Sequence, residues 1–126
     1  MKLVRLTDAR MHDALQRLSA APIPLRTAFK LKGISAKVEE ELRKFEQCRQ
    51  EALMKFGKKD SNGNLVTKAD GSVEFEREQM QAFIKELNEL GETEVSVPSI
   101  SIHELGDKVD NFSANDLIML DGILVE

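Results

Sequence analysis

The sequence contains no tryptophan and no tyrosine, and phenylalanine supplies all of its aromatic residues, which make up 5% of the chain. Large flat aromatic side chains anchor many tight protein interfaces, and they form the stacking platforms that bind single-stranded nucleic acids. Such anchors are therefore scarce in this protein.

Cysteine and long apolar runs are also nearly absent. Cys48 is the only cysteine, so no intrachain disulfide can form, which indicates a reducing compartment. Because Cys48 falls within a helical pattern, we expect it to be a small buried or half-buried hydrophobic residue. No segment approaches the ~20 apolar residues of a membrane span, and residues 1–6 are too short and too charged for a signal peptide. These absences predict a cytoplasmic protein that does not enter a membrane.

The charge balance is mildly acidic, with 18 Lys and Arg against 22 Asp and Glu. A net charge of −4 repels a phosphate backbone unless the basic residues cluster. The densest basic stretch, residues 26–37, contains no acidic residue, but three consecutive glutamates follow at residues 39–41. Nucleic-acid binding is therefore the least favoured of the functions considered below.

The sequence offers no motif for catalysis, metal binding or phosphate binding. Residues 60–64 resemble the start of a calcium loop, but Leu65 stands where the turn glycine is needed and Gly71 where a bidentate carboxylate is needed. His12 and His103 have no cysteine or carboxylate at ligand spacing. A glycine-rich phosphate loop, a nucleophile elbow and a His-Glu-x-x-His motif are all missing. We expect a protein that is not an enzyme and that binds no cofactor or metal.

Apolar residues recur every three or four positions in four segments, which predicts helices over residues 7–21, 25–56, 76–90 and 113–122. Pro22 and Pro24 end the first helix. Ser113 and Asp116 have the spacing of a capping box at the start of the last. In the third, we expect the apolar residues to point inward (Met80, Phe83, Ile84, Leu87, Leu90).

The predicted helix 25–56 is the dominant feature, because its apolar residues form a heptad-like row from Val38 to Phe56. Gly33 either bends this helix or is carried through it at a cost of about 1 kcal/mol, and Gly57 ends it. An unbroken helix would be roughly 48 Å long, at about 1.5 Å per residue. The row therefore either packs on helices 7–21 and 76–90 as the core, or extends beyond them to contact another chain.

Two shorter segments favour β-structure. Residues 65–67 and 72–75 flank an Asp70-Gly71 turn, which predicts a β-hairpin over residues 65–75. Residues 94–102 alternate apolar and polar side chains around Pro98, which predicts an edge strand with a break. The sequence thus indicates a single α+β domain that is mainly helical. A long amphipathic helix packs with two or three shorter helices, a β-hairpin and one edge strand.

The order of these features resembles the small uncharacterised proteins of tailed bacteriophages that are grouped as a domain of unknown function. The resemblance runs over almost the whole chain, and it implies a phage origin and expression in the cytoplasm of a bacterial host, with a place in the virion as one outcome. It carries over no catalytic residue. Its short phrases are Ala21-Pro22-Ile23-Pro24-Leu25, Ala52-Leu53-Met54-Lys55-Phe56-Gly57, the Asp-Ser-Asn-Gly-Asn loop with Asp70-Gly71, Glu86-Leu87-Asn88-Glu89-Leu90, and Val95-x-Val97 before Ile100-x-Ile102.

We expect a protein–protein interaction role, first in virion assembly or structure. The alternative is a host-directed binder that inhibits a bacterial host or defence protein, or is sensed by one. The third hypothesis is nucleic-acid binding through the basic stretch (Arg26, Lys30, Lys32, Lys37). An exposed helical row also allows a homo-oligomer. The candidate partner-binding residues are the outer end of the long helix (Phe45, Arg49, Ala52, Phe56) and a strand edge suited to strand addition (Val95, Val97, Ile100, Ile102).

Overall fold

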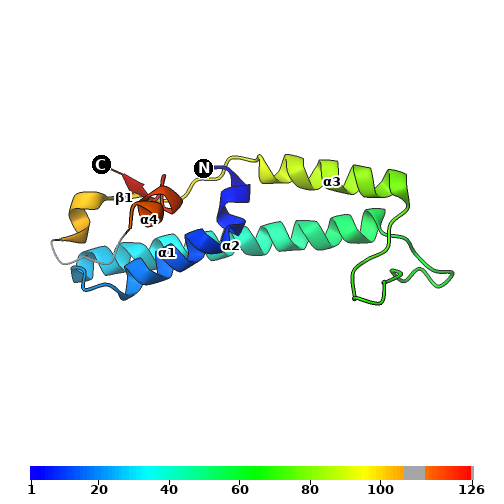
Figure 1. The fold of residues 1–126 in the computed structure, drawn as a ribbon, viewed down its shortest axis with the longest axis horizontal. Helices are drawn as coiled ribbons and strands as arrows, with labels where there is room; N and C mark the ends of the chain where they lie inside the picture. Colours follow the sequence, from blue (N-terminus) through cyan, green and yellow to red (C-terminus); the bar gives the residue numbers. More distant parts are fainter. Residues whose placement is uncertain (107–112, 126) are drawn as a thin grey trace.

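The computed structural model describes residues 1–106 and 113–125. The fold is mainly helical with a small parallel sheet, so the predicted fold class is confirmed. Figure 1 shows α2 running along the molecule, with α1 and α4 beside one half and α3 beside the other. In chain order the elements are 3₁₀-helix η1 (Leu3–Thr7), α1 (Ala9–Ala20), α2 (Leu25–Phe56), α3 (Arg77–Gly91), β1 (Ile100–Ser101), 3₁₀-helix η2 (Ile102–Leu105), α4 (Ala114–Met119) and β2 (Leu124–Val125).

Helix α2 is continuous from Leu25 to Phe56, the bounds that the sequence indicates. Gly33 lies on an exposed face of the helix, where an added Cβ would meet nothing within 4 Å. Gly57 follows the last turn with φ −66°, so the left-handed conformation is not what requires glycine there. A Cβ on Gly57 would instead lie 2.6 Å from both the Leu53 carbonyl oxygen and the Leu65 side chain. Close packing of the following loop therefore selects this glycine.

The first half of α2 forms the floor of a hydrophobic core, and we call this half of the molecule the body. Helix α2 contributes Leu31, Ile34 and Val38 to it. Helix α1 lies against them, held at its start by Asp8, whose carboxylate accepts from the Arg10 backbone N–H. The other large, fully buried side chains of the body come from η1, α1, β1 and the turns between α4 and β2 (Leu6, Met11, Leu18, Ile100, Leu120, Ile123).

Polar contacts fix the C-terminal elements to the body. The predicted capping box of α4 is confirmed, because Ser113 and Asp116 each accept a hydrogen bond from the other's backbone N–H. Asp116 also pairs with Arg17 of α1. The Thr27 hydroxyl donates to the Glu104 carbonyl (2.5 Å), which joins the start of α2 to η2. These bonds satisfy groups that would otherwise be costly to bury.

The second half of α2 packs antiparallel to α3, and residues 57–76 connect the two helices in the chain. We call this half of the molecule the arm. Residues 57–76 form three short extended stretches that are joined by backbone hydrogen bonds. The Val66 N–H donates to the Lys58 carbonyl oxygen, and the Glu74 N–H donates to the Val66 carbonyl oxygen. The region of the predicted hairpin contains a single antiparallel bridge, Thr67 to Val73, around the Asp70-Gly71 turn. The Phe75 ring lies 5.0 Å from the Phe83 ring and so joins this segment to α3.

The predicted strand over residues 94–102 is shorter than expected and is not a free edge. Only Ile100 and Ser101 form a strand, which pairs in parallel with Leu124 and Val125. At its start, Glu94 bridges to Lys2 in antiparallel register. Residues from both ends of the chain occupy the backbone groups that a partner strand would need, and neither pairing is visible in local sequence patterns.

Gly33 within α2 and Gly57 directly after it allow a matched stability test. We expect Gly33→Ala to raise the free energy of unfolding by about 0.5–1 kcal/mol, because alanine loses less backbone entropy in an exposed helix interior. Gly57→Ala should lower it by about 1–3 kcal/mol through overpacking. Urea denaturation of both variants measures this, and an unchanged Gly33→Ala protein would contradict a continuous α2.

Candidate functional site: the two-helix arm

The arm has no buried core among the residues described. The last buried residue of α2 is Glu41, and the only buried residue of α3 is Gly91. The apolar side chains between the two helices are half-buried instead (Leu42, Phe45, Ala52, Leu53, Phe56, Ala82, Phe83, Leu87, Leu90). Two helices in one layer cover each other along one stripe only, so their flanks stay open to solvent.

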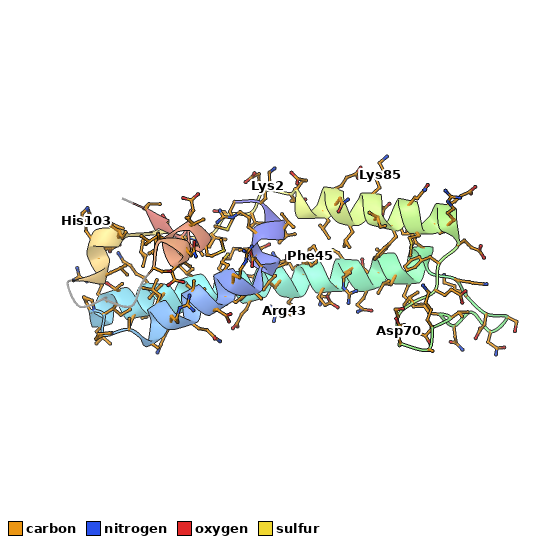
Figure 2. The ribbon with its side chains drawn as sticks, in the orientation of Figure 1. Lys2, Arg43, Phe45, Asp70, Lys85 and His103 are labelled. Carbon is orange, nitrogen blue, oxygen red and sulfur yellow. The ribbon has the colours of Figure 1, made fainter. Side chains whose placement is uncertain are left out.

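The four predicted partner-binding residues of α2 lie on the stripe that faces α3. Phe45, Arg49, Ala52 and Phe56 are all half-buried, and Figure 2 shows Phe45 near the middle of α2. Arg49 is held by a two-pronged ion pair, with its Nε 2.9 Å and its Nη2 2.8 Å from the Glu46 carboxylate oxygens. The three apolar residues therefore lie in the contact with α3, while Arg49 is held on its own helix by Glu46. A partner would reach these residues from the flanks of the arm.

One flank of the arm is charged. Lys55 Nζ of α2 lies 3.1 Å from Glu86 Oε1 of α3, and the two side chains bridge the groove between the helices. Cys48 and Glu51 line the same groove. Cys48 is exposed, which corrects the expectation of a buried or half-buried residue. Its position in the heptad-like row suggested burial, but α3 is too narrow a cover to reach it.

The opposite flank carries the mutually paired Glu46 and Arg49 and is otherwise made of uncharged residues, and we call it the neutral side (Gln50, Leu53, Met80, Gln81, Ile84, Asn88). Ile84 and Glu86 are two residues apart and so project from opposite sides of α3, as do Leu53 and Lys55 on α2. Met80 and Ile84 are 38% and 48% exposed. The prediction that these two residues point inward is therefore wrong in this chain, because the single stripe of contact takes only Phe83, Leu87 and Leu90.

The neutral side continues the groove that α1 fills in the body. Ser35 and Glu39 of α2 line the contact with α1. From Glu39, steps of three, four and seven residues lead to Leu42, Glu46 and Leu53, which therefore lie on the same side of α2. Helix α1 begins at Ala9 and covers α2 only in the body. Beyond its start, the arm presents the same side of α2 with no third helix among the described elements.

The second predicted surface is mostly engaged within the fold. Ile100 is 2% exposed and belongs to the core, so it is not available to a partner. Val95, Val97 and Ile102 are partly buried and pack against the same core. The alternation around Pro98 that predicted an edge strand reflects packing onto the body.

Metal and membrane sites find no support in the described part of the chain. No group of three or more His, Cys, Asp and Glu residues there is placed to hold a metal ion. His12 is half-buried, and its Nε2 lies 2.6 Å from the Leu6 carbonyl oxygen. None of the helices in these residues has an apolar stretch long enough to cross a membrane.

Comparisons with known proteins find no match. No family model, no curated protein and no solved structure is similar to this chain.

Arg49 keeps the neighbouring Glu46 carboxylate in its charged form. Hydrogen bonds from Arg49 and then from Gln50 lower the pKa of Glu46 from 4.5 to about 2. A carboxylate with a lowered pKa stabilises the fold above its unfolded pKa, and this contribution is lost as the pH falls through the folded value. Glu41 is held in the same way by Lys37 and Lys44, which also lower its pKa.

We therefore expect the Glu46 carboxylate to titrate near pH 2 in the folded protein. Arg49→Met should raise this pKa toward its ordinary value, because the strongest hydrogen-bond donor is removed. Carbon-detected NMR titration measures the midpoint. Lys55→Met is the control, since Lys55 pairs with Glu86 and should leave Glu46 unchanged. An Arg49→Met protein with an unmoved Glu46 midpoint would contradict the pair.

Proposed function

We propose that this chain is a non-enzymatic, phage-encoded interaction protein that acts in virion assembly or structure. Its arm binds a helix of a virion protein along the neutral side. The observation that carries the proposal is the two-helix arm, whose apolar row has no third helix to cover it among the described residues. The phage assignment is supported by the resemblance in the order of its short sequence phrases.

A helix is the partner element that this surface fits best. The neutral side extends the groove occupied by α1 in the body, so a partner helix laid along it continues a packing that the chain already uses. Met80 and Ile84 are four residues apart, and they present a stripe of the spacing that a helix face fills. With a third helix in place, the arm becomes a three-helix bundle with a closed core.

The chemistry of the neutral side suits a specific contact of moderate strength. Met80 and Ile84 are each about half exposed, and covering them contributes roughly 1 kcal/mol apiece at ordinary transfer energies. Methionine adapts to irregular surfaces, while Gln50, Gln81 and Asn88 offer side-chain hydrogen bonds. The charged groups on this side, Glu46 and Arg49, are already paired with each other before a partner binds.

The experiment compares wild-type protein with Ile84→Gln and Met80→Gln in infected cells. Both changes put a helix-compatible polar residue at an exposed position, so the free energy of unfolding should shift by less than about 0.5 kcal/mol. We expect wild-type chain in purified particles or assembly intermediates by mass spectrometry, and at least a tenfold loss for the two variants. Glu89→Gln, three residues from Glu86 on the charged flank of α3, is the matched control and should be retained.

Two results would overturn the proposal. Absence of the wild-type chain from both particles and assembly intermediates would remove the virion role. A stoichiometric bacterial protein that is recovered with wild type and lost with Ile84→Gln would instead assign the neutral side to a host-directed function.

A further inference from the structure

A second apolar surface lies on the outer face of α2 at the opposite end of the molecule from the arm. Leu25 and Phe29 are 87% and 77% exposed, the highest values among the large hydrophobic residues of the described chain. They are four residues apart and share one face, which is turned away from the buried Thr27 and Leu31. An exposed apolar surface of this kind usually marks a binding site.

The charges around Leu25 and Phe29 are mostly positive, and Glu104 is the acidic residue that the structure places beside them. Residues 25–38 include four Lys and Arg and no acidic residue. Lys30 pairs with Glu104 and Lys37 with Glu41. Arg26 and Lys32 are exposed and form no ion pair with any residue that the structure describes. We call Leu25, Arg26, Phe29 and Lys32 the basic patch.

Helix α4 carries a surface of the opposite character, which we call the acidic patch (Leu117, Ile118, Asp121). Residues 113–126 contain three acidic residues and no Lys or Arg. Ile118 is 61% exposed and lies beside Asp121 in a shallow pocket. Asp116 is taken by Arg17, whereas exposed Asp121 has no ion-pair partner among the described residues. Arg5, which also lines the pocket, donates to the Met119 carbonyl (3.5 Å).

The two patches cannot meet within one chain. The buried face of α2 points into the body, so Leu25 and Phe29 point out of it. Helix α4 packs on α1 through its buried Asp116 and Leu120, and it lies above α1 and α2 in Figure 1. Leu117 and Ile118 project from the exposed face of α4, away from the body. Among the described residues, therefore, neither patch covers the other within a single copy.

We propose that the basic patch of one copy docks on the acidic patch of a second copy, so that copies of this chain associate head to tail. Apolar side chains meet apolar side chains, and Arg26 and Lys32 meet Asp121. A second copy is favoured over an anionic lipid surface, which is usually recognised by clusters of about four to eight cations. Here only Arg26 and Lys32 lack an ion-pair partner among the residues that the structure describes. The contact is heterologous, so every dimer keeps one basic patch and one acidic patch unoccupied. Further copies can therefore add to it.

Mixing of single-patch variants tests the head-to-tail arrangement. Wild-type protein should show species larger than a dimer in sedimentation velocity as its concentration rises. Phe29→Gln and Ile118→Gln should each weaken self-association about tenfold or more, since an apolar anchor is lost. An equimolar mixture of the two variants should form a dimer and nothing larger, because one intact patch remains on each chain.

Charge reversal provides an independent measurement. Lys32→Glu and Asp121→Lys should each weaken association, and a protein carrying both changes should recover it. Ile84→Gln on the arm is the control and should associate like wild type, which separates this contact from the proposed arm function. Circular dichroism of each variant checks that the helices are retained.

Three outcomes would overturn the proposal. The first is a strictly monomeric wild-type chain at the highest attainable concentration. The second is a mixture of Phe29→Gln and Ile118→Gln that fails to form a dimer. The third is the absence of self-association together with binding to phosphatidylserine–phosphatidylcholine vesicles that Phe29→Gln abolishes, which would make the basic patch a lipid-binding surface.

Discussion

The rest of the structure depends on the length of α2 relative to the elements available to cover it. An amphipathic helix is stabilised mainly by burying its apolar stripe, and a stripe on a 32-residue helix needs cover along its whole length. Helix α1, α4, η1 and the small sheet all gather on the first half, where Leu31, Ile34 and Val38 are fully buried. Only α3 is left for the second half. The contrast between a body with a closed core and an arm without one follows from this distribution.

Much of the fold could be predicted from the sequence because its signals are local. The step pattern from Val38 to Phe56 defines α2, and the spacing of Ser113 and Asp116 marks the start of α4. Packing that depends on distant segments gave no such signal. The expected strand over residues 94–102 is reduced to Ile100 and Ser101, because chain termini pair with its two ends.

The candidate site shows the same limit in more detail. Periodicity placed Met80 and Ile84 on the apolar face of α3 together with Phe83, and that placement is geometrically sound. Periodicity does not say how wide the cover on that face is. A single facing helix covers a narrow stripe, so Phe83 lies inside the contact, whereas Ile84 lies at its margin and is 48% exposed. Cys48 is exposed for the same reason on the other helix. Met80, Ile84 and Cys48, which the sequence pattern assigned to buried positions, are thus the residues that the arm exposes to solvent.

The arm nevertheless keeps its two helices together, because close packing at its two ends closes the stripe of contact between them. At the tip, the Phe75 ring packs on Phe83, and Gly57 admits the Leu65 side chain against the end of α2. At the base, Gly91 allows Val4 of η1 to approach so closely that an added Cβ would lie 3.1 Å from it. Both ends are fixed, so the spacing of the helices between them is set before any partner arrives. A partner helix would then lose its own freedom on binding but would not have to order the arm, and preorganisation of this kind lets a small apolar surface support a specific contact.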